Sequence, residues 1–135
     1  MNEKDNVSEI EKDSKKEQEK SEESNAGEES LIKNIKNFIN SANKIYNDQD
    51  YTSAVILYFK ALFSVLDLII LKDKGFAPKD HNERFRVLQK YFPKFYLIID
   101  KNFHVYQGSY SKSVEKEVCD RIKQDVERII KEQNI

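Results

Sequence analysis

Apolar residues recur at intervals of three and four from residue 31 onward, which is the pattern of amphipathic α-helices. The first such segment covers residues 31–46, with Ser30 as its predicted N-cap, and the polar residues 47–50 follow it. The second covers about residues 51–72, and its apolar positions occupy most of the helix circumference. A helix of this kind is central, so we expect the rest of the chain to cover it on several sides.

The next segments are shorter and more polar. A loop with one glycine and one proline, residues 73–80, leads to a third predicted helix at about residues 81–91. Pro93 ends or kinks that helix. Periodicity does not assign the apolar run at residues 95–99, but a helical turn or a short helix is favoured over a lone strand.

A final amphipathic helix is predicted at about residues 111–133, after a break at Gly108. No pair of apolar runs is joined by a β-hairpin turn sequence, and the chain has only three glycines. The sequence therefore predicts an all-α fold, an antiparallel bundle of four to five helices.

The N-terminal segment differs from this bundle in composition and charge. Residues 1–30 hold five lysines against eleven acidic residues, a net charge of −6, whereas residues 31–135 hold eighteen basic and thirteen acidic residues, a net charge of +5. Because residues 1–30 have too few apolar side chains to offset the entropy of ordering, we expect a disordered acidic tail. The predicted domain is residues 31–135.

Several features bear on the compartment. The single cysteine, Cys119, excludes an intramolecular disulfide and a CxxC metal motif. The first residues have no apolar core of the kind found in secretory signals. The most apolar stretch, residues 54–71, is interrupted by Lys60 and Asp67, so it does not predict a membrane span. We therefore expect a soluble, cytoplasmic protein that has no contact with a membrane.

The two histidines are the first candidates for chemistry. His81 lies at the predicted start of the third helix, where Asp80 as an N-cap explains the local sequence and a ligand or base is the alternative. His104 lies in a polar, aromatic segment with Tyr106, Ser109 and Tyr110. Buried tyrosine hydroxyls explain part of that composition, and a binding or catalytic role for the segment is the alternative.

Motifs for common cofactors and catalytic devices are absent from the sequence. It contains no glycine-rich phosphate loop, no HExxH zinc motif and no nucleophile elbow. A metal site would need the two histidines together with carboxylates that are distant in sequence. We therefore expect neither a cofactor nor a metal.

A basic and aromatic segment suggests contact with nucleic acid, because clustered cations bind phosphates and exposed aromatic rings stack on bases. The alternative is a solvated helix face, since acidic residues are interleaved and the aromatic residues fit a core-facing stripe. The basic residues of the segment are Lys72, Lys74, Lys79, Arg84, Arg86, Lys90 and Lys94, and its aromatic residues are Phe76, Phe85, Tyr91 and Phe92.

Residues 41–67 are similar to helix pairs of two known families. Ala42, Tyr51, Ala54, Tyr58 and Ala61 are spaced as in a tetratricopeptide repeat, but no second copy follows at about 34 residues, so a repeat array is not expected.

The same stretch, together with the order of the predicted helices, resembles the HEPN superfamily of small helical bundles over about residues 31–132. Many members of that superfamily are ribonucleases with an Arg-x4–6-His motif, often followed by x-Tyr. His104-Val105-Tyr106 resembles the end of this motif, whereas residues 97–99 are Leu, Ile and Ile where the arginine would stand.

The resemblance implies a non-catalytic HEPN-like module that binds RNA, a nucleotide or a partner protein, with Tyr106, Ser109 and Tyr110 as binding residues. It also implies a homodimer, and the number of aromatic residues favours one as well, because 15 Phe and Tyr residues are hard to bury in one copy of a small domain. One alternative is a divergent, metal-independent ribonuclease that uses His104 with Lys101 or Arg84. Another is a protein-interaction scaffold built on a helix hairpin. With the scaffold, the acidic tail is a partner-binding arm. Alternatively, the tail masks the basic body.

Overall fold

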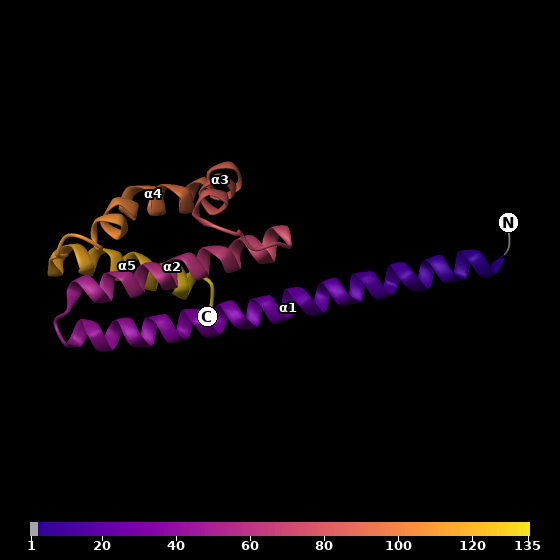
Figure 1. The fold of residues 1–135 in the computed structure, drawn as a ribbon, viewed down its shortest axis with the longest axis horizontal. Coiled ribbons are helices and arrows are strands. Elements are labelled where there is room, and N and C mark those ends of the chain that lie inside the picture. Colours follow the sequence, from indigo (N-terminus) through magenta and orange to yellow (C-terminus); the bar gives the residue numbers. More distant parts are fainter. Residues whose placement is uncertain (1–2) are drawn as a thin grey trace.

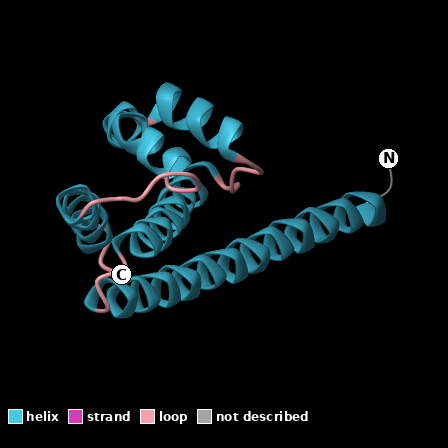
Figure 2. Ribbon diagram, turned by 60° about the vertical axis from the view of Figure 1, so that its left-hand side comes forward, coloured by secondary structure: helices cyan, strands magenta, loops and turns pink. Residues whose placement is uncertain are grey.

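The computed structural model describes the backbone of residues 3–135 and the side chains of residues 25–135. Within that part, every regular element is a helix, and the predicted all-α antiparallel bundle is confirmed (Figure 1; Figure 2). The predicted disordered tail falls largely on residues whose side chains lie outside the described part. The helices are α1 (Glu3–Asn47), α2 (Tyr51–Lys74), α3 (His81–Tyr91), α4 (Pro93–Gly108) and α5 (Lys116–Glu132).

α2 is the centre of the bundle, as its apolar circumference predicts. Every residue from 61 to 71 is buried, and α1, α3, α4 and α5 all pack against it. α2 begins where Asp50 accepts a hydrogen bond from the Ser53 amide, and it ends at Gly75, whose φ of 82° only glycine adopts readily. Although α2 alone among the described helices is long and apolar enough to span a membrane, 72% of its most apolar window is buried. α2 is therefore the core helix of a soluble bundle.

α1 forms a hairpin with α2, and the two helices run in opposite directions (Figure 1). The predicted start of this helix, with Ser30 as N-cap, is wrong, because Ser30 lies inside α1. The packing continues N-terminally to Gly27, where an added Cβ would lie 3.4 Å from Cδ2 of Leu71. Apolar periodicity missed this turn because its residues are mostly polar, and the glutamates among them are good helix formers.

α3 and α4 form a second layer over α2 (Figure 2). Asp80 caps α3 by accepting a hydrogen bond of 2.9 Å from the Glu83 amide, as predicted. Pro93 ends α3 and also occupies the first turn of α4, where a missing N–H costs nothing. The apolar run at residues 95–99 is helical and belongs to α4.

The last helix begins five residues later than its predicted start at residue 111, because two contacts hold the preceding loop. The Lys112 amide donates a hydrogen bond of 2.8 Å to the Gly108 carbonyl. The Val114 amide donates one of 2.8 Å to Oγ1 of Thr52, in the first turn of α2. α5 then packs its regular apolar stripe on α2, and the stripe comprises Cys119, Ile122, Val126 and Ile129.

Candidate functional site

A buried ion pair joins α3 to the core helix. Nε of Arg84 donates to Oδ1 of Asp67 at 2.7 Å, and Nη2 donates to Oδ2 at 2.9 Å. Both residues are less than a tenth exposed. This two-pronged geometry matches the guanidinium fork to the carboxylate and satisfies both charges away from water. Arg84 was predicted as a binding residue, but these hydrogen bonds engage its guanidinium with Asp67.

The same arginine determines the protonation state of His81. Nη1 of Arg84 lies 2.6 Å from Nδ1 of His81, and a guanidinium can only donate. Nδ1 is therefore the acceptor, and the proton of the neutral ring is on Nε2. Burial, and then the positive charge of Arg84, lower the pKa of His81 below its ordinary value. His81 is thus a neutral hydrogen-bond donor at physiological pH.

Aromatic rings surround this pair on the side of α4. The His81 ring lies edge-on to Phe63 and Phe103, with centroids at 4.7 Å and 5.5 Å. Tyr106 packs edge-on against Phe63 at 5.1 Å, and its hydroxyl lies 2.8 Å from the hydroxyl of Tyr110. Burial raises the pKa of Tyr106 to about 12. Four predicted site residues therefore gather in one cluster, which comprises His81, Arg84, Tyr106 and Tyr110.

The other two polar residues of that segment lie apart from the cluster. Ser109 is buried, and its Oγ donates to the Tyr106 carbonyl, so its hydrogen bond stabilises the end of α4. His104 is exposed on a different face of α4 from Tyr106. His104 and Tyr106 therefore lie on different faces of α4, because residues two apart on a helix point in different directions.

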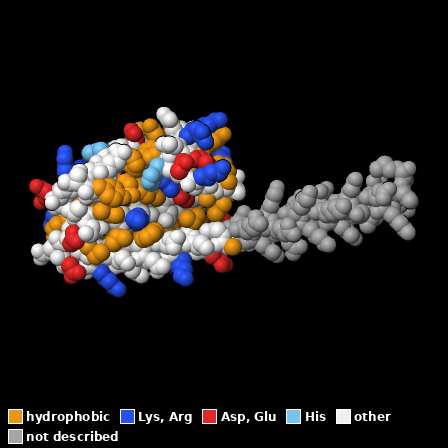
Figure 3. All heavy atoms as spheres, in the orientation of Figure 1, with side chains coloured by type: hydrophobic (Ala, Val, Ile, Leu, Met, Phe, Trp, Pro, Cys, Tyr) orange, Lys and Arg blue, Asp and Glu red, His pale blue; other side chains and the backbone are white. Residues whose placement is uncertain are grey.

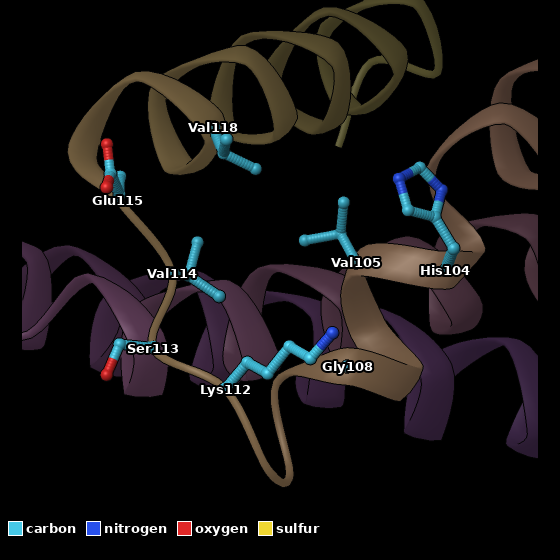
Figure 4. A pocket seen from close by; sticks show the side chains of 8 residues that line it. All are labelled: His104, Val105, Gly108, Lys112, Ser113, Val114, Glu115 and Val118. Carbon is cyan, nitrogen blue, oxygen red and sulfur yellow. The ribbon is translucent and has the colours of Figure 1, made fainter.

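His104 lines a pocket between α4, α5 and the loop that joins them, with a volume of about 280 Å³. Figure 4 shows Val105, Val114 and Val118 converging on its centre, while Glu115 and Ser113 point away. The side chain of Lys112 runs along its lower edge toward Gly108 (Figure 4). The pocket therefore has an aliphatic floor, and its polar lining residues are His104, Lys112, Ser113 and Glu115.

A third feature, the Tyr91 surface, lies at the opposite end of α4. The Tyr91 ring is 47% exposed, with Nζ of Lys74 at 3.9 Å from its centroid and Nζ of Lys90 at 5.1 Å. Phe76 is exposed as well. The Tyr91 surface comprises these two rings together with Lys72, Lys74, Lys79, Arg86, Lys90 and Lys94, all exposed.

The structure places the side chains of the basic segment in two environments. Phe85 and Phe92 pack against the core, as expected for aromatic residues on a core-facing stripe. Tyr91 and Phe76 are free to meet a ligand, and so are Arg86 and Lys90.

Asp67 is the site residue that the sequence argument missed. The signal was present, since a carboxylate in a helix of otherwise apolar circumference requires a buried partner. The sequence did not say which cation would reach it.

In the cluster of His81, Arg84, Tyr106 and Tyr110, the groups suited to general acid–base catalysis are already engaged. Nδ1 of His81 is occupied by Arg84, and the guanidinium of Arg84 is engaged by Asp67. Among residues 25–135, no three histidine, cysteine or carboxylate side chains are placed to hold a metal ion.

The chain matches no protein-family model, no curated protein and no solved structure.

The ion pair generates a stability prediction. Replacing Arg84 by Ala leaves the Asp67 carboxylate buried without a partner, and we expect a loss of about 3–5 kcal/mol in the free energy of unfolding. Urea denaturation followed by circular dichroism measures this loss. The double variant Asp67→Leu with Arg84→Met removes both charges and should recover most of it. A double variant as unstable as Arg84→Ala would contradict the ion-pair explanation.

His81 generates a pH prediction. Its folded pKa lies below the unfolded value of about 6.5, so the unfolded state binds more protons as the pH falls through that value. Acidification from about pH 7.5 to about pH 5.5 should therefore destabilise the wild type more than His81→Gln. Thermal melts at the two pH values test this, with His104→Gln as the control that removes an exposed imidazole. Equal losses in the wild type and His81→Gln would contradict it.

Proposed function

We propose that this protein is a non-enzymatic helical module that binds single-stranded RNA through the Tyr91 surface. The observation that carries the proposal is the exposed Tyr91 ring, which has the ammonium groups of Lys74 and Lys90 over it, at 3.9 Å and 5.1 Å from its centroid. A base that stacks on this ring displaces an ammonium group from the ring face, and the lysines then meet the flanking phosphates. Stacking tolerates any base, because every base has a π-face, so the proposed binding has little sequence preference.

The charge around Tyr91 favours a polyanion. Residues 72–94 hold six exposed basic side chains against three acidic ones, because the seventh basic residue, Arg84, is paired with Asp67 in the core. Figure 3 shows lysine and arginine side chains gathered over α3 and the end of α2, with acidic ones among them. This surplus predicts binding that weakens as salt rises, since phosphate contacts release counterions.

The geometry disfavours the form of the ribonuclease alternative that uses Arg84. A metal-independent ribonuclease needs a histidine for proton transfer and a free cation to clamp the phosphate. His104 is exposed, but Arg84 is engaged with Asp67 in the core, which disfavours the rival that pairs these two residues. Membership of the HEPN superfamily, cytoplasmic localisation and the alternative of a divergent ribonuclease stay predictions.

The homodimer also stays a prediction, and the structure weakens one argument for it. The number of aromatic residues suggested that one copy could not bury them, yet all except Phe76, Tyr91 and Tyr110 are buried or half-buried in the single chain. A partner protein on the Tyr91 surface is the competing occupant in the test below.

Replacing Tyr91 by Ala removes the stacking platform, so we expect RNA affinity to fall by about 1–3 kcal/mol, roughly fivefold to a hundredfold. Fluorescence anisotropy with a labelled oligouridylate of about 12 nucleotides measures it, with cleavage read on a gel from the same samples. Tyr91→Phe keeps an aromatic ring at the same position and is the matched control.

Equal affinity of the wild type and Tyr91→Ala would contradict the proposed surface. No binding at low salt would contradict the RNA function and would favour the protein-interaction alternative. Cleavage that disappears in His104→Ala would support the ribonuclease instead.

The acidic N-terminal segment precedes the turn of α1 that packs on the end of α2, where the Tyr91 surface has Lys72 and Lys74. Gly27 packs against Leu71, one residue before Lys72, and residues 1–24 carry nine acidic residues and five lysines. Because unscreened like charges repel over about 10 Å at 0.1 M salt, we expect deletion of residues 1–24 to strengthen RNA binding at low salt and to matter less at high salt. A full-length variant with glutamine or asparagine at the nine acidic positions should behave like the deletion. Unchanged affinity in both would contradict masking.

A further inference from the structure

The exposed face of α4 carries a row of side chains that begins at the Tyr91 surface and continues beyond it. Lys94, Leu97, Lys101 and His104 are all exposed, and their spacing of three, four and three places them on one stripe of the helix. Leu97 is 65% exposed and is the apolar member of the stripe. Asp100 stands next to this stripe as an exposed acidic residue.

The row connects two features at opposite ends of α4. Lys94 belongs to the Tyr91 surface, and His104 lines the pocket between α4 and α5. Lys112 supplies a second cation on the pocket rim, and Glu115 points away from the centre (Figure 4). Cations therefore recur from one end of α4 to the other, with apolar surface at Leu97 and in the pocket between them.

We propose that a bound single strand of RNA continues from Tyr91 along this row and places one base in the pocket lined by Val105, Val114 and Val118. This inference rests on the proposed function and adds the course and the length of the strand. On this course, phosphates lie beside Lys94 and Lys101, and Lys112 meets the phosphate of the inserted base.

The dimensions fit a strand of several nucleotides. The helix rise places Lys94 and His104 about 15 Å apart along the axis, which is roughly four stacked nucleotides at about 3.4 Å each. The nucleotide on Tyr91, its neighbours on the flanking lysines and the base in the pocket extend the site to about eight. The pocket, at about 280 Å³, is smaller than the pockets that hold drug-sized ligands and has room for a single base.

A length series tests this course. Labelled oligouridylates of about 4, 8 and 12 nucleotides are titrated with the full chain at low salt. We expect affinity to rise more than tenfold from the shortest to the middle length and then to level off. A site limited to the Tyr91 surface would bind all three lengths alike, apart from the small statistical gain of a longer strand.

Variants along the row identify the contacts. Lys101→Ala and Lys112→Ala should each weaken binding of the 12-nucleotide strand about threefold to tenfold and lower its salt slope by about 0.7, because each removes one phosphate contact. Binding of the 4-nucleotide strand should not change. Lys44→Ala, an exposed lysine on α1, makes the same change in charge on the opposite side of α2 and is the control (Figure 1).

Gly108 offers a way to fill the pocket without disturbing the fold. It lines the pocket as the last residue of α4, and a Cβ added there meets nothing within 4 Å. Gly108→Leu should therefore reduce affinity for the 12-nucleotide strand and leave both the melting temperature and binding of the 4-nucleotide strand unchanged. Gly108→Ala is the milder control.

Two results would overturn the inference, and they separate it from the proposed function. If binding depends on Tyr91 but not on strand length, Lys101, Lys112 or Gly108, the course along α4 is wrong and the Tyr91 surface stands. If no strand of any length binds, both proposals are wrong.

Discussion

The structure depends on the burial of α2. Its apolar side chains surround the helix, so no single neighbour can remove them from water, and every other described helix packs against it. The packing of the first and last helices follows from this constraint, since α1 and α5 each place one apolar stripe on α2. A regular stripe is sufficient for each contact with α2, and the hydroxyl of Tyr46 in α1 also donates a hydrogen bond to Asp120 in α5.

α3 and α4 are held differently. Their layer meets α2 through the Asp67–Arg84 ion pair and the rings of Phe63 and Tyr106, in addition to aliphatic packing. A buried ion pair is weak evidence for stability, because the cost of removing both charges from water offsets much of their attraction. What it provides here is a specific position for α3, since only one placement of Arg84 satisfies both oxygens of Asp67.

That position has consequences for function. With Arg84 in the core, the remaining cations of α3 face solvent together with Tyr91, and α4 extends from this surface to the pocket at His104. The residues that are best suited to bind a polyanion therefore lie on the layer that contributes least to the core. A ligand can meet this layer without disturbing the packing of α1, α2 and α5.

The sequence by itself determined the fold class, the central place of α2 and most helix positions, because apolar periodicity and capping residues such as Asp80 are local properties. It placed the start of α5 wrongly, since the bond from Val114 to Thr52 joins residues that are far apart in the chain. Only the tertiary structure assigned Arg84 to Asp67 and distinguished the exposed rings from the buried ones. These outcomes depend on which side chains meet across helices, and the spacing of residues along one helix does not contain that information.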